Sequence, residues 1–531
     1  MFKINLRKCY VTLAILLILF STPSMLAINI DTSQSVLAQE NTTTATNDNN
    51  SMLIADSPGL DNNMIINNNK VSMANTTTPS GSTSNNTIRV PSEEGFSTTI
   101  LATNLSAPHN ILYGPDGLLW ITERTGKNLT IVDPDTGEEV HTISVPGVHQ
   151  SGAQDGLLGM AFGPDFNNTH HIYLAYTYDT DPNSDQLERL TKITRFTYDP
   201  LTGTINEPVD LIKGLKGSID HNAGRMVFGP DGKLYYTIGD QGKNQLSLIC
   251  MNIEAQNLPT TKEVIDQNWT AYQGKVLRMN PDGSIPEDNP VIDGVQSHIF
   301  TYGHRNPQGL TVGPNGDLYV AEHGPDSDDE VNHLIAGGNY GWPYVAGFKD
   351  NNAYRYINWS STGEQCPNLD SNNVTAAIKA GATVLNESEF NAKNFVHPVA
   401  TFFTVDNSYN FSDHDCGDLA YICNPTIAPS SLDLYTSDHI PGWNGTLLMT
   451  TLKSGKIYQL TVNENGTGLA KDPVELFHSE NRYRDLAISP DGSTLYVITD
   501  SSGPAQAIGG GATTDLWNPG SILKFKYEGN E

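Results

Sequence analysis

A turn that recurs through the chain limits its fold more than any other feature. Five segments share one plan: an apolar strand, a turn built on Pro followed by Asp or Asn, and a second strand rich in aromatic and β-branched residues. Pro presets its φ, Asp and Asn tolerate turn geometry, and the Gly that follows in most copies supplies a positive φ. Each copy therefore predicts a β-hairpin. The copies span residues 111–124, 160–176, 226–240, 310–323 and 486–500.

The spacing of these hairpins predicts how many there are. The interval between the last two copies is about twice the others, and residues 445–460 fill it as a sixth hairpin with a degenerate turn. Six hairpins over about 440 residues leave roughly 73 residues each, which fits four strands with long connections. The 47 Gly and 30 Pro agree with many turns. We therefore expect an all-β fold over residues 91–531, a six-bladed β-propeller with four-stranded antiparallel blades and functional loops around a central channel.

The first 90 residues have a different character. Basic residues precede a short apolar run at 10–20, so residues 1–38 are expected to be a secretory signal peptide. An uncleaved membrane anchor is the alternative, and cleavage after Ala27 or Ala38 stays open. Residues 39–90 are rich in Asn, Thr and Ser without an aromatic residue, which predicts a disordered linker. Roughly a dozen glycosylation sequons add to the expectation of a secreted or cell-surface protein.

Cysteine usage agrees with export. Cys416 and Cys423 bracket a short loop, and we expect a disulfide between them. Spacing alone does not pair Cys250 with Cys366, and no Cys/His grouping has the spacing of a zinc site.

The charge balance excludes two classes of partner. The chain has 30 basic and 59 acidic residues, a net charge of −29, and residues 1–90 are neutral, so the expected propeller carries the whole excess. Nucleic-acid backbones and anionic membranes both require clustered Lys and Arg, so neither is expected as a partner. An acidic excess is compatible with calcium.

A His and an Asp flank one hairpin. His221 lies just before hairpin 226–240 and Asp240 ends it, and the two ends of a hairpin return to the same edge of a sheet. We therefore expect the two side chains to meet, and a His held by a carboxylate is a general base. The alternative is a surface His beside a turn Asp.

Polar groups also flank hairpin 310–323. Arg305 precedes it, where a guanidinium can stabilise developing negative charge; the alternative is a structural Arg that ties blades together. Residues 326–330 follow it and contain four carboxylates, which predicts calcium; the alternative is a solvated acidic loop. Residues 339–343 show no chemical role beyond packing.

A cationic group precedes the last hairpin. Arg482 and Arg484 share a strand face because alternate side chains do, and Lys453 lies at a turn of the preceding blade. Guanidiniums side by side repel each other, which predicts a multiply anionic ligand. Salt bridges with the abundant acidic residues are the alternative.

Several stretches, in order between about Gly152 and Tyr527, carry a resemblance to one family. They include GRMVFGPDGKLYYTIGDQGKNQL, GHRNPQGL, GPDSDDEVN, GGNYGWP, CGDLAYIC and NRYRD. Together they resemble the soluble quinoprotein glucose dehydrogenases, within the wider family of PQQ-dependent aldose sugar dehydrogenases. The resemblance implies a six-bladed propeller that holds pyrroloquinoline quinone (PQQ), a tricarboxylate, with calcium on the quinone.

The resemblance also implies roles for individual residues. His221 matches the general base, Asp240 the carboxylate that orients it, and Arg305 the group that stabilises charge on the quinone oxygen. The implied cofactor-binding set is Gln154, His221, Leu246, Arg305, Asn306, Lys453, Arg482 and Arg484. The implied substrate set is Gln154, Asp220, Gln245, Tyr421 and Asn424. The carbonyls of Gly324 and Pro325 match ligands of the quinone's calcium, and structural calcium maps to Asp329, Glu330, Tyr340, Ala346, Phe348, Asp350 and Glu387.

The implied reaction is the oxidation of an aldose at C1 to its lactone. The base takes the proton of the anomeric hydroxyl, C1 delivers hydride to the quinone, and electrons pass to an external acceptor. Asn424 departs from the pattern, since glucose-oxidising members carry Trp there over the sugar, and His323 stands where they have Gln. Family members are often dimers, so a homodimer stays open.

Two other classes of function compete with this interpretation. A calcium-dependent sugar lactonase would need a metal-bound water and no anion pocket. A non-catalytic extracellular propeller would have no reason to gather His221, Asp240 and Arg305 around one channel. Binding of PQQ separates the first function from the other two.

Overall fold

The computed structural model describes residues 89–184, 186–369, 374–411 and 416–529. The expected signal peptide or anchor (1–38) and nearly all of the expected linker (39–90) lie outside these residues. Within the described ranges, no helix combines the length and the apolar character that crossing a membrane requires.

Six four-stranded antiparallel sheets make up the fold, as the hairpin repeat predicted. The first three blades are β2 (Pro108–Tyr113), β3 (Leu119–Glu123), β4 (Asn128–Val132) and β5 (Glu139–Ser144); β6 (Leu157–Phe162), β7 (His171–Asp179), β8 (Arg189–Asp199) and β9 (Thr204–Lys216); and β10 (Met226–Phe228), β11 (Leu234–Ile238), β12 (Lys275–Met279) and β15 (Ile299–Tyr302).

The last three blades complete the set. They are β16 (Pro307–Val312), β17 (Leu318–Glu322), β18 (Asp329–Leu334) and β21 (Ala400–Phe402); β22 (Asp433–Tyr435), β23 (Thr446–Thr450), β24 (Ile457–Leu460) and β25 (Val474–Leu476); and β26 (Tyr483–Ile488), β27 (Thr494–Thr499), β30 (Ile522–Tyr527) and β1 (Phe96–Ala102).

Short elements lie in the connections between these strands. They are α1 (Phe166–Thr169), α2 (Thr261–Ile265) and α3 (Val374–Lys379); the 3-10 turns η1 (Leu246–Leu248), η2 (Thr270–Tyr272), η3 (Trp359–Asn368), η4 (Glu387–Glu389) and η5 (Gly417–Cys423); and the two-stranded sheets β13 (Val291–Ile292) with β14 (Val295–Gln296), β19 (Tyr356–Asn358) with β20 (Thr383–Leu385), and β28 (Ala505–Gln506) with β29 (Ala512–Thr513).

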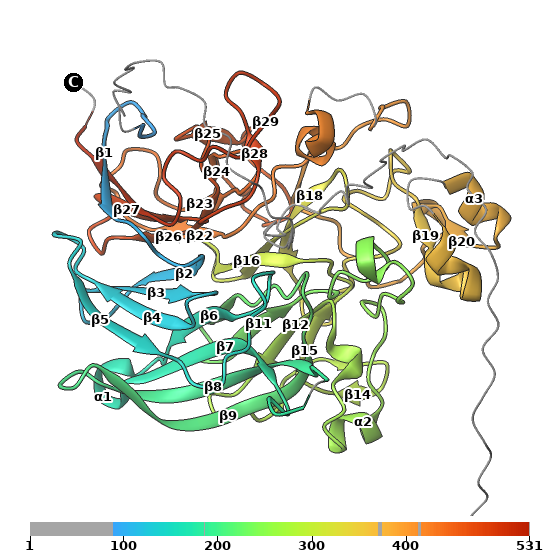
Figure 1. Cartoon of the computed structure of the whole chain (residues 1–531), viewed down its shortest axis with the longest axis horizontal. Helices are drawn as coiled ribbons and strands as arrows, with labels where there is room; N and C mark the ends of the chain where they lie inside the picture. Colours follow the sequence, from blue (N-terminus) through green and yellow to red (C-terminus); the bar gives the residue numbers. More distant parts are fainter. Residues whose placement is uncertain (1–88, 185, 370–373, 412–415, 530–531) are drawn as a thin grey trace, which may run out of the picture. The chain divides into compact units, whose positions relative to one another are not determined.

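The first strands of the blades close into a ring. Strands β2, β6, β10, β16, β22 and β26 contact one another in that order, and β26 returns to contact β2. The amino-terminal strand β1 pairs with the carboxy-terminal strand β30, from Phe96 opposite Tyr527 to Ala102 opposite Ile522, so the last blade joins both ends of the described chain (Figure 1). This ring confirms the six-bladed propeller.

The recurrent turn forms the inner hairpin of five blades. In the first blade, Gly117 has φ 84°, and the Asp116 carboxylate accepts hydrogen bonds from Leu118 N (3.2 Å) and Trp120 Nε1 (3.1 Å). The assignment of residues 445–460 needs a correction. These residues form β23 and β24, the middle pair of the fifth blade, and its inner hairpin is β22–β23, where residues 436–445 replace the short turn.

Apolar side chains fill the interfaces between consecutive blades. Trp120 and Phe196 pack between the first two blades, and Tyr236 lies in the cluster between the second and third. Comparable clusters lie at the other four interfaces. Because close-packed interiors resist small displacements, these interfaces hold the loops at the inner strand ends in fixed relative positions.

Two disulfides cross-link the connections. Cys416 and Cys423 are bonded, which confirms the expected pair. Cys250 and Cys366, which spacing left unpaired, are also bonded and join the segment after η1 to η3. This second bond ties the connection inside the third blade to the long connection inside the fourth.

Candidate active site

His221 and Asp240 meet as the hairpin argument predicted. His221 Nδ1 lies 2.7 Å from Asp240 Oδ1, and both side chains are 1% exposed. Asp240 Oδ1 also accepts from Gly242 N (2.9 Å), and Asp240 Oδ2 accepts from Trp342 Nε1 (2.8 Å). With Nδ1 donating to this carboxylate, Nε2 of a neutral ring is an acceptor.

The side chains around His221 Nε2 form one polar network. Gln245 Nε2 lies 3.3 Å from His221 Nε2 and 2.9 Å from Asp220 Oδ2, and Gln245 Oε1 accepts from Arg305 Nη2 at 2.9 Å. Gln154 Nε2 donates to Asp220 Oδ1 (2.5 Å), and His221 N donates to Gln154 Oε1 (3.2 Å). The structure therefore brings five of the implied residues together, with Leu246 next to Gln245 at the start of η1.

Arg305 reaches this network from the strand end before β16. Its backbone N–H donates to Glu322 Oε2 (2.9 Å), and its guanidinium carbon lies 5.4 Å from the centre of the Trp342 ring. In the described part of the chain, the buried Arg305 Nε and the buried Asn306 Nδ2 have no hydrogen-bond partner. Buried polar atoms normally have partners, so these two donors are available to a molecule bound at the site.

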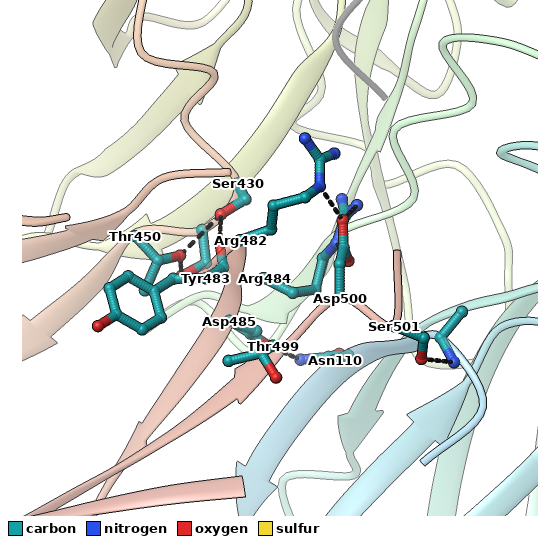
Figure 2. Close-up of polar contacts among 12 residues, drawn as sticks. Asn110, Ser430, Thr450, Arg482, Tyr483, Arg484, Asp485, Thr499, Asp500 and Ser501 are labelled. Carbon is teal, nitrogen blue, oxygen red and sulfur yellow. Dashed lines mark hydrogen bonds and ion pairs between the residues drawn. The ribbon is translucent and has the colours of Figure 1, made fainter. Parts of the chain in front are cut away.

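Arg482 directly precedes β26, Arg484 lies in it, and both side chains share the carboxylate of Asp500 (Figure 2). Arg484 Nε and Nη2 donate to it at 2.7 and 2.8 Å, and Arg482 Nε donates at 3.1 Å. Burial raises the pKa of Asp500, but the guanidiniums of Arg484 and Arg482 outweigh burial and hold this pKa below its usual range. The salt-bridge alternative is thus correct in part, because both guanidiniums pair with Asp500.

Lys453 lies in a cage of oxygen atoms. Its ammonium is fully buried and donates to the carbonyls of Asn424 (2.6 Å) and Tyr421 (3.2 Å) and to Thr426 Oγ1. Burial lowers the pKa of Lys453 to about 7, and the nearby carboxylate of Asp329 opposes this shift. Lys453 therefore anchors the segment 421–426 that carries the implied substrate residues.

Asn424 adds a free acceptor to this segment. Its Nδ2 donates to Asp326 Oδ1 (3.0 Å), whereas its buried Oδ1 has no partner among the described residues. Asn424 is thus held by its amide nitrogen and presents its amide oxygen.

The loop after β17 packs closely beside Arg305. A Cβ on Gly324 would lie 2.0 Å from Ser327 O, so only Gly fits this position. A cavity there is lined by Gly303, Arg305, Glu322, His323, Gly324, Pro325, Glu330, Tyr340, Trp342, Val345 and Ala346. Burial lowers the pKa of His323 well below its ordinary value, and His323 Nε2 lies 3.0 Å from Pro429 O.

Glu330 and Glu387 converge on the loop 346–351. Glu330 Oε1 accepts from Gly347 N (2.5 Å), and Glu387 accepts from the backbone N–H groups of Ala346, Asp350 and Asn351. Burial raises the pKa of Glu387 to about 7, and burial followed by the charge of Glu322 raises that of Glu330 well above its ordinary value. A bound cation would relieve both effects.

The other implied metal ligands lie in different surroundings. Asp329 faces away from Glu330 and accepts from Gly324 N (2.8 Å), Ile427 N (2.6 Å) and Ala428 N (2.8 Å). Tyr340 Oη donates to His333 O, and Phe348 is 39% exposed. In the described residues, no three His, Cys, Asp or Glu side chains form a metal-binding group.

Sequence reasoning missed Trp342, Thr426, Glu322 and Asp500. The last two had a signal, because Glu322, Asp500 and Asp240 all stand where the second strand of a hairpin ends. Applied to every hairpin, the rule that selected Asp240 would have found them. Trp342 had no such signal, since its partners Asp240 and Arg305 lie in loops distant from it in the sequence.

Comparison with known proteins places the chain. A family model described as glucose/sorbosone dehydrogenase matches residues 105–392 and 391–507. Quinoprotein glucose dehydrogenase B of Acinetobacter calcoaceticus is 47% identical over 440 residues, which cover 82% of this chain and 92% of the relative. Aldose sugar dehydrogenase YliI of Escherichia coli is 28% identical over 418 residues, covering 76% and 90%.

The structural comparison agrees. The PQQ-bound form of aldose sugar dehydrogenase from Streptomyces coelicolor superposes with a TM-score of 0.53 and 25% identity over 82% of this chain and 99% of that one. The extent of the family match and the 47% identity show that this chain belongs to the glucose/sorbosone dehydrogenase family, with quinoprotein glucose dehydrogenase and aldose sugar dehydrogenases among its relatives.

Proposed function

We propose that this protein is a PQQ- and calcium-dependent aldose dehydrogenase that oxidises glucose-like sugars at C1 to the lactone. The observation that carries this proposal is the buried pair of His221 Nδ1 and Asp240 Oδ1, 2.7 Å apart, linked through Gln245 to Arg305. Membership of a family with quinoprotein relatives supports the cofactor.

The donors around the site fit PQQ. The buried Arg305 Nε and Asn306 Nδ2 lack partners among the described residues, and an unsatisfied buried donor costs about 1–3 kcal/mol. Arg482 and Arg484 lie beside each other at Asp500, and guanidinium groups pair well with carboxylates such as those of PQQ. When bound, PQQ supplies the two-electron acceptor that takes the hydride from C1 of the sugar.

His221 is the base in this proposal. Asp240 holds the ring through Nδ1, so Nε2 is the atom that receives the proton of the anomeric hydroxyl. Asp220 Oδ1 lies 3.7 Å from Nε2, and this second carboxylate favours the imidazolium once the proton has moved. The sugar thus loses one proton to His221 and one hydride from C1, which leaves the lactone.

Arg305, Tyr421 and Asn424 position the reactants. The aromatic face of Trp342 and the side chain of Gln245 hold the guanidinium of Arg305 in place. A fixed positive charge at this point stabilises negative charge that develops beside it during the reaction. Tyr421 and the amide oxygen of Asn424 are the proposed contacts to sugar hydroxyls.

Calcium is proposed at two places. The carbonyl oxygens of Gly324 and Pro325 accept no backbone hydrogen bond from the described residues and border the cavity beside Arg305, so they would hold the cation that polarises the quinone. Glu330, Glu387 and the 346–351 loop would hold a structural ion, which would stabilise the ionised form of both buried carboxylates.

Export and an external electron acceptor complete the proposal. Two disulfides are typical of proteins that fold in an oxidising compartment, and the basic, apolar start of the sequence fits a signal peptide. A soluble dye substitutes for the natural acceptor in an assay.

The test uses the full-length protein with PQQ and calcium, and follows dye reduction over a panel of aldoses. We expect sugar-dependent reduction that disappears in His221→Ala and on calcium chelation, and returns when calcium is added back. Binding of PQQ, seen by absorbance, without oxidation of any aldose would refute the substrate. Absence of PQQ binding would refute the cofactor and favour the lactonase or the non-catalytic propeller.

A further inference from the structure

One tryptophan contacts two oppositely charged groups of the candidate site, Asp240 and Arg305. Trp342 is 8% exposed, its indole Nε1 donates to Asp240 Oδ2 at 2.8 Å, and its ring centre lies 5.4 Å from the guanidinium carbon of Arg305. Its N–H edge thus meets an anion, and its π face meets a cation. Both geometries are attractive, because an indole N–H donates to carboxylates and an aromatic face attracts guanidinium.

The contact with Asp240 completes the carboxylate. Asp240 Oδ1 is shared by His221 Nδ1 and Gly242 N, whereas in the described residues the indole is the hydrogen-bond donor to Oδ2. A carboxylate held at both oxygens cannot rotate about its terminal bond. The indole N–H therefore fixes the plane of Asp240, and through it the direction of His221 Nε2.

The contact with Arg305 fixes the second group. Arg305 N is held by Glu322 (2.9 Å) and Nη2 by Gln245 (2.9 Å), while Nε has no partner within the described ranges. The indole face gives the guanidinium a further contact, beside the bond from Nη2 to Gln245. Without the ring, the long Arg side chain would regain rotameric freedom.

Trp342 is itself held from several directions. Its backbone N donates to Gly303 O (2.9 Å), its carbonyl accepts from Gln256 Nε2 (2.7 Å), and the ring of Tyr354 lies 5.8 Å from its own. These contacts come from elements that lie far apart in the sequence. The indole is thus a rigid support, as a positioning residue requires.

We propose that Trp342 is a positioning residue that sets the relative placement of the base His221 and of Arg305, through its N–H edge and its π face respectively. This inference rests on the proposed function for its meaning in catalysis. Its structural content, the coupling of Trp342 to Asp240 and to Arg305, can be tested without a sugar.

Two substitutions separate the two contacts. Trp342→Phe keeps an aromatic face for Arg305 but has no N–H for Asp240, and Trp342→Leu removes both. Trp269→Phe is the matched control, because Trp269 is 6% exposed and its Nε1 donates to Lys213 O (2.9 Å) in another part of the fold. Thermal melting of each full-length variant checks that it folds.

The first readout is the proton between His221 and Asp240 in the cofactor-free protein. Its downfield NMR resonance is identified by its loss in Asp240→Asn, and we expect it to shift in Trp342→Phe but not in Trp269→Phe. If Trp342→Phe does not fold, the indole N–H of Trp342 is compared between wild type and Asp240→Asn, where it should move upfield. An unchanged resonance in either comparison overturns the proposal.

The second readout separates the edge from the face. In Trp342→Phe we expect kcat to fall about tenfold with KM little changed, as for the loss of one hydrogen bond to a charged group. In Trp342→Leu the dissociation constant of PQQ, measured by absorbance titration, should also rise about fivefold. Equal PQQ affinity in the two variants would refute the role of the contact with Arg305. A wild-type kcat in Trp342→Phe would refute the role of the hydrogen bond to Asp240. If the wild type oxidises no sugar, the proposed function fails, while the NMR and PQQ-binding results still decide the role of Trp342.

Discussion

Removal of the Cys250–Cys366 disulfide should destabilise this protein more than removal of Cys416–Cys423. The two bonds span 116 and 7 residues of chain. In the chain-entropy model, closing the longer loop lowers the entropy of the unfolded chain enough to stabilise the fold by about 5 kcal/mol, against about 2.5 kcal/mol for the shorter loop. The longer bond also packs inside a small apolar cluster with Trp359 and Ala377, so its loss loosens two connections at once.

The comparison uses two double variants of the full-length protein, Cys250→Ala/Cys366→Ala and Cys416→Ala/Cys423→Ala. For a domain of this size, 5 kcal/mol corresponds to a fall in melting temperature of about 5 °C, and 2.5 kcal/mol to about half of that. Differential scanning calorimetry at one scan rate measures both. Equal shifts, or a larger shift for the short loop, would show that the unfolded-chain argument does not govern this fold.

The short disulfide should act locally instead. Its loop contains Tyr421, whose carbonyl accepts from the ammonium of Lys453 at 3.2 Å. Loss of Cys416–Cys423 should therefore raise the dissociation constant of PQQ more than loss of Cys250–Cys366 does, although it lowers the melting temperature less. Loss of the long disulfide should lower the melting temperature more and change the dissociation constant of PQQ less. Calorimetry and PQQ titration of the two double variants check both expectations.

Three further predictions follow from the site. Asp240→Asn should lower kcat roughly a thousandfold, because an amide cannot hold His221 in the tautomer that leaves Nε2 free; single-turnover dye reduction measures this, and a loss below tenfold would contradict it. Asn424→Trp should lower KM for glucose by about fivefold, because it would place an aromatic ring over the sugar. Steady-state kinetics of the variant and the wild type with glucose measure this, and a higher KM in the variant would contradict it. Asp500→Asn should lower the melting temperature at pH 7, because Arg484 and Arg482 depress the pKa of Asp500; such a depressed pKa stabilises the fold above the unfolded pKa and ceases to do so as pH falls through the folded pKa. The destabilisation should therefore shrink between pH 7 and pH 3, and a pH-independent difference in melting temperature would count against this ion-pair argument.

Local patterns were enough for the repeating part of the fold. A Pro-Asp-Gly turn between strand-forming segments has one favourable local structure, so five hairpins and the blade number followed from spacing alone. The fifth blade was assigned wrongly, because residues 436–445 carry no such turn. Its second and third strands were therefore taken for its first and second strands. Without the recurrent Pro-Asp-Gly turn, the sequence does not show which pair of strands a hairpin joins.

Contacts within one hairpin were also within reach of the sequence. His221 and Asp240 flank the same two strands, and Arg482 and Arg484 lie two residues apart at the start of β26, so short-range geometry brings each pair together. The sharing of Asp500 by both arginines was not predicted, although its position at the end of β27 was a usable signal.

The sequence by itself determined the blade repeat, the His221–Asp240 pair, the Cys416–Cys423 bond and, through resemblance, the family. Only the tertiary structure decided which residues of different blades meet at the site. It joined Cys250 to Cys366, placed Trp342 between Asp240 and Arg305, and enclosed Lys453 in carbonyl oxygens. The physical reason is range: turn chemistry and strand alternation act over a few residues, whereas these contacts depend on how six packed interfaces close the ring.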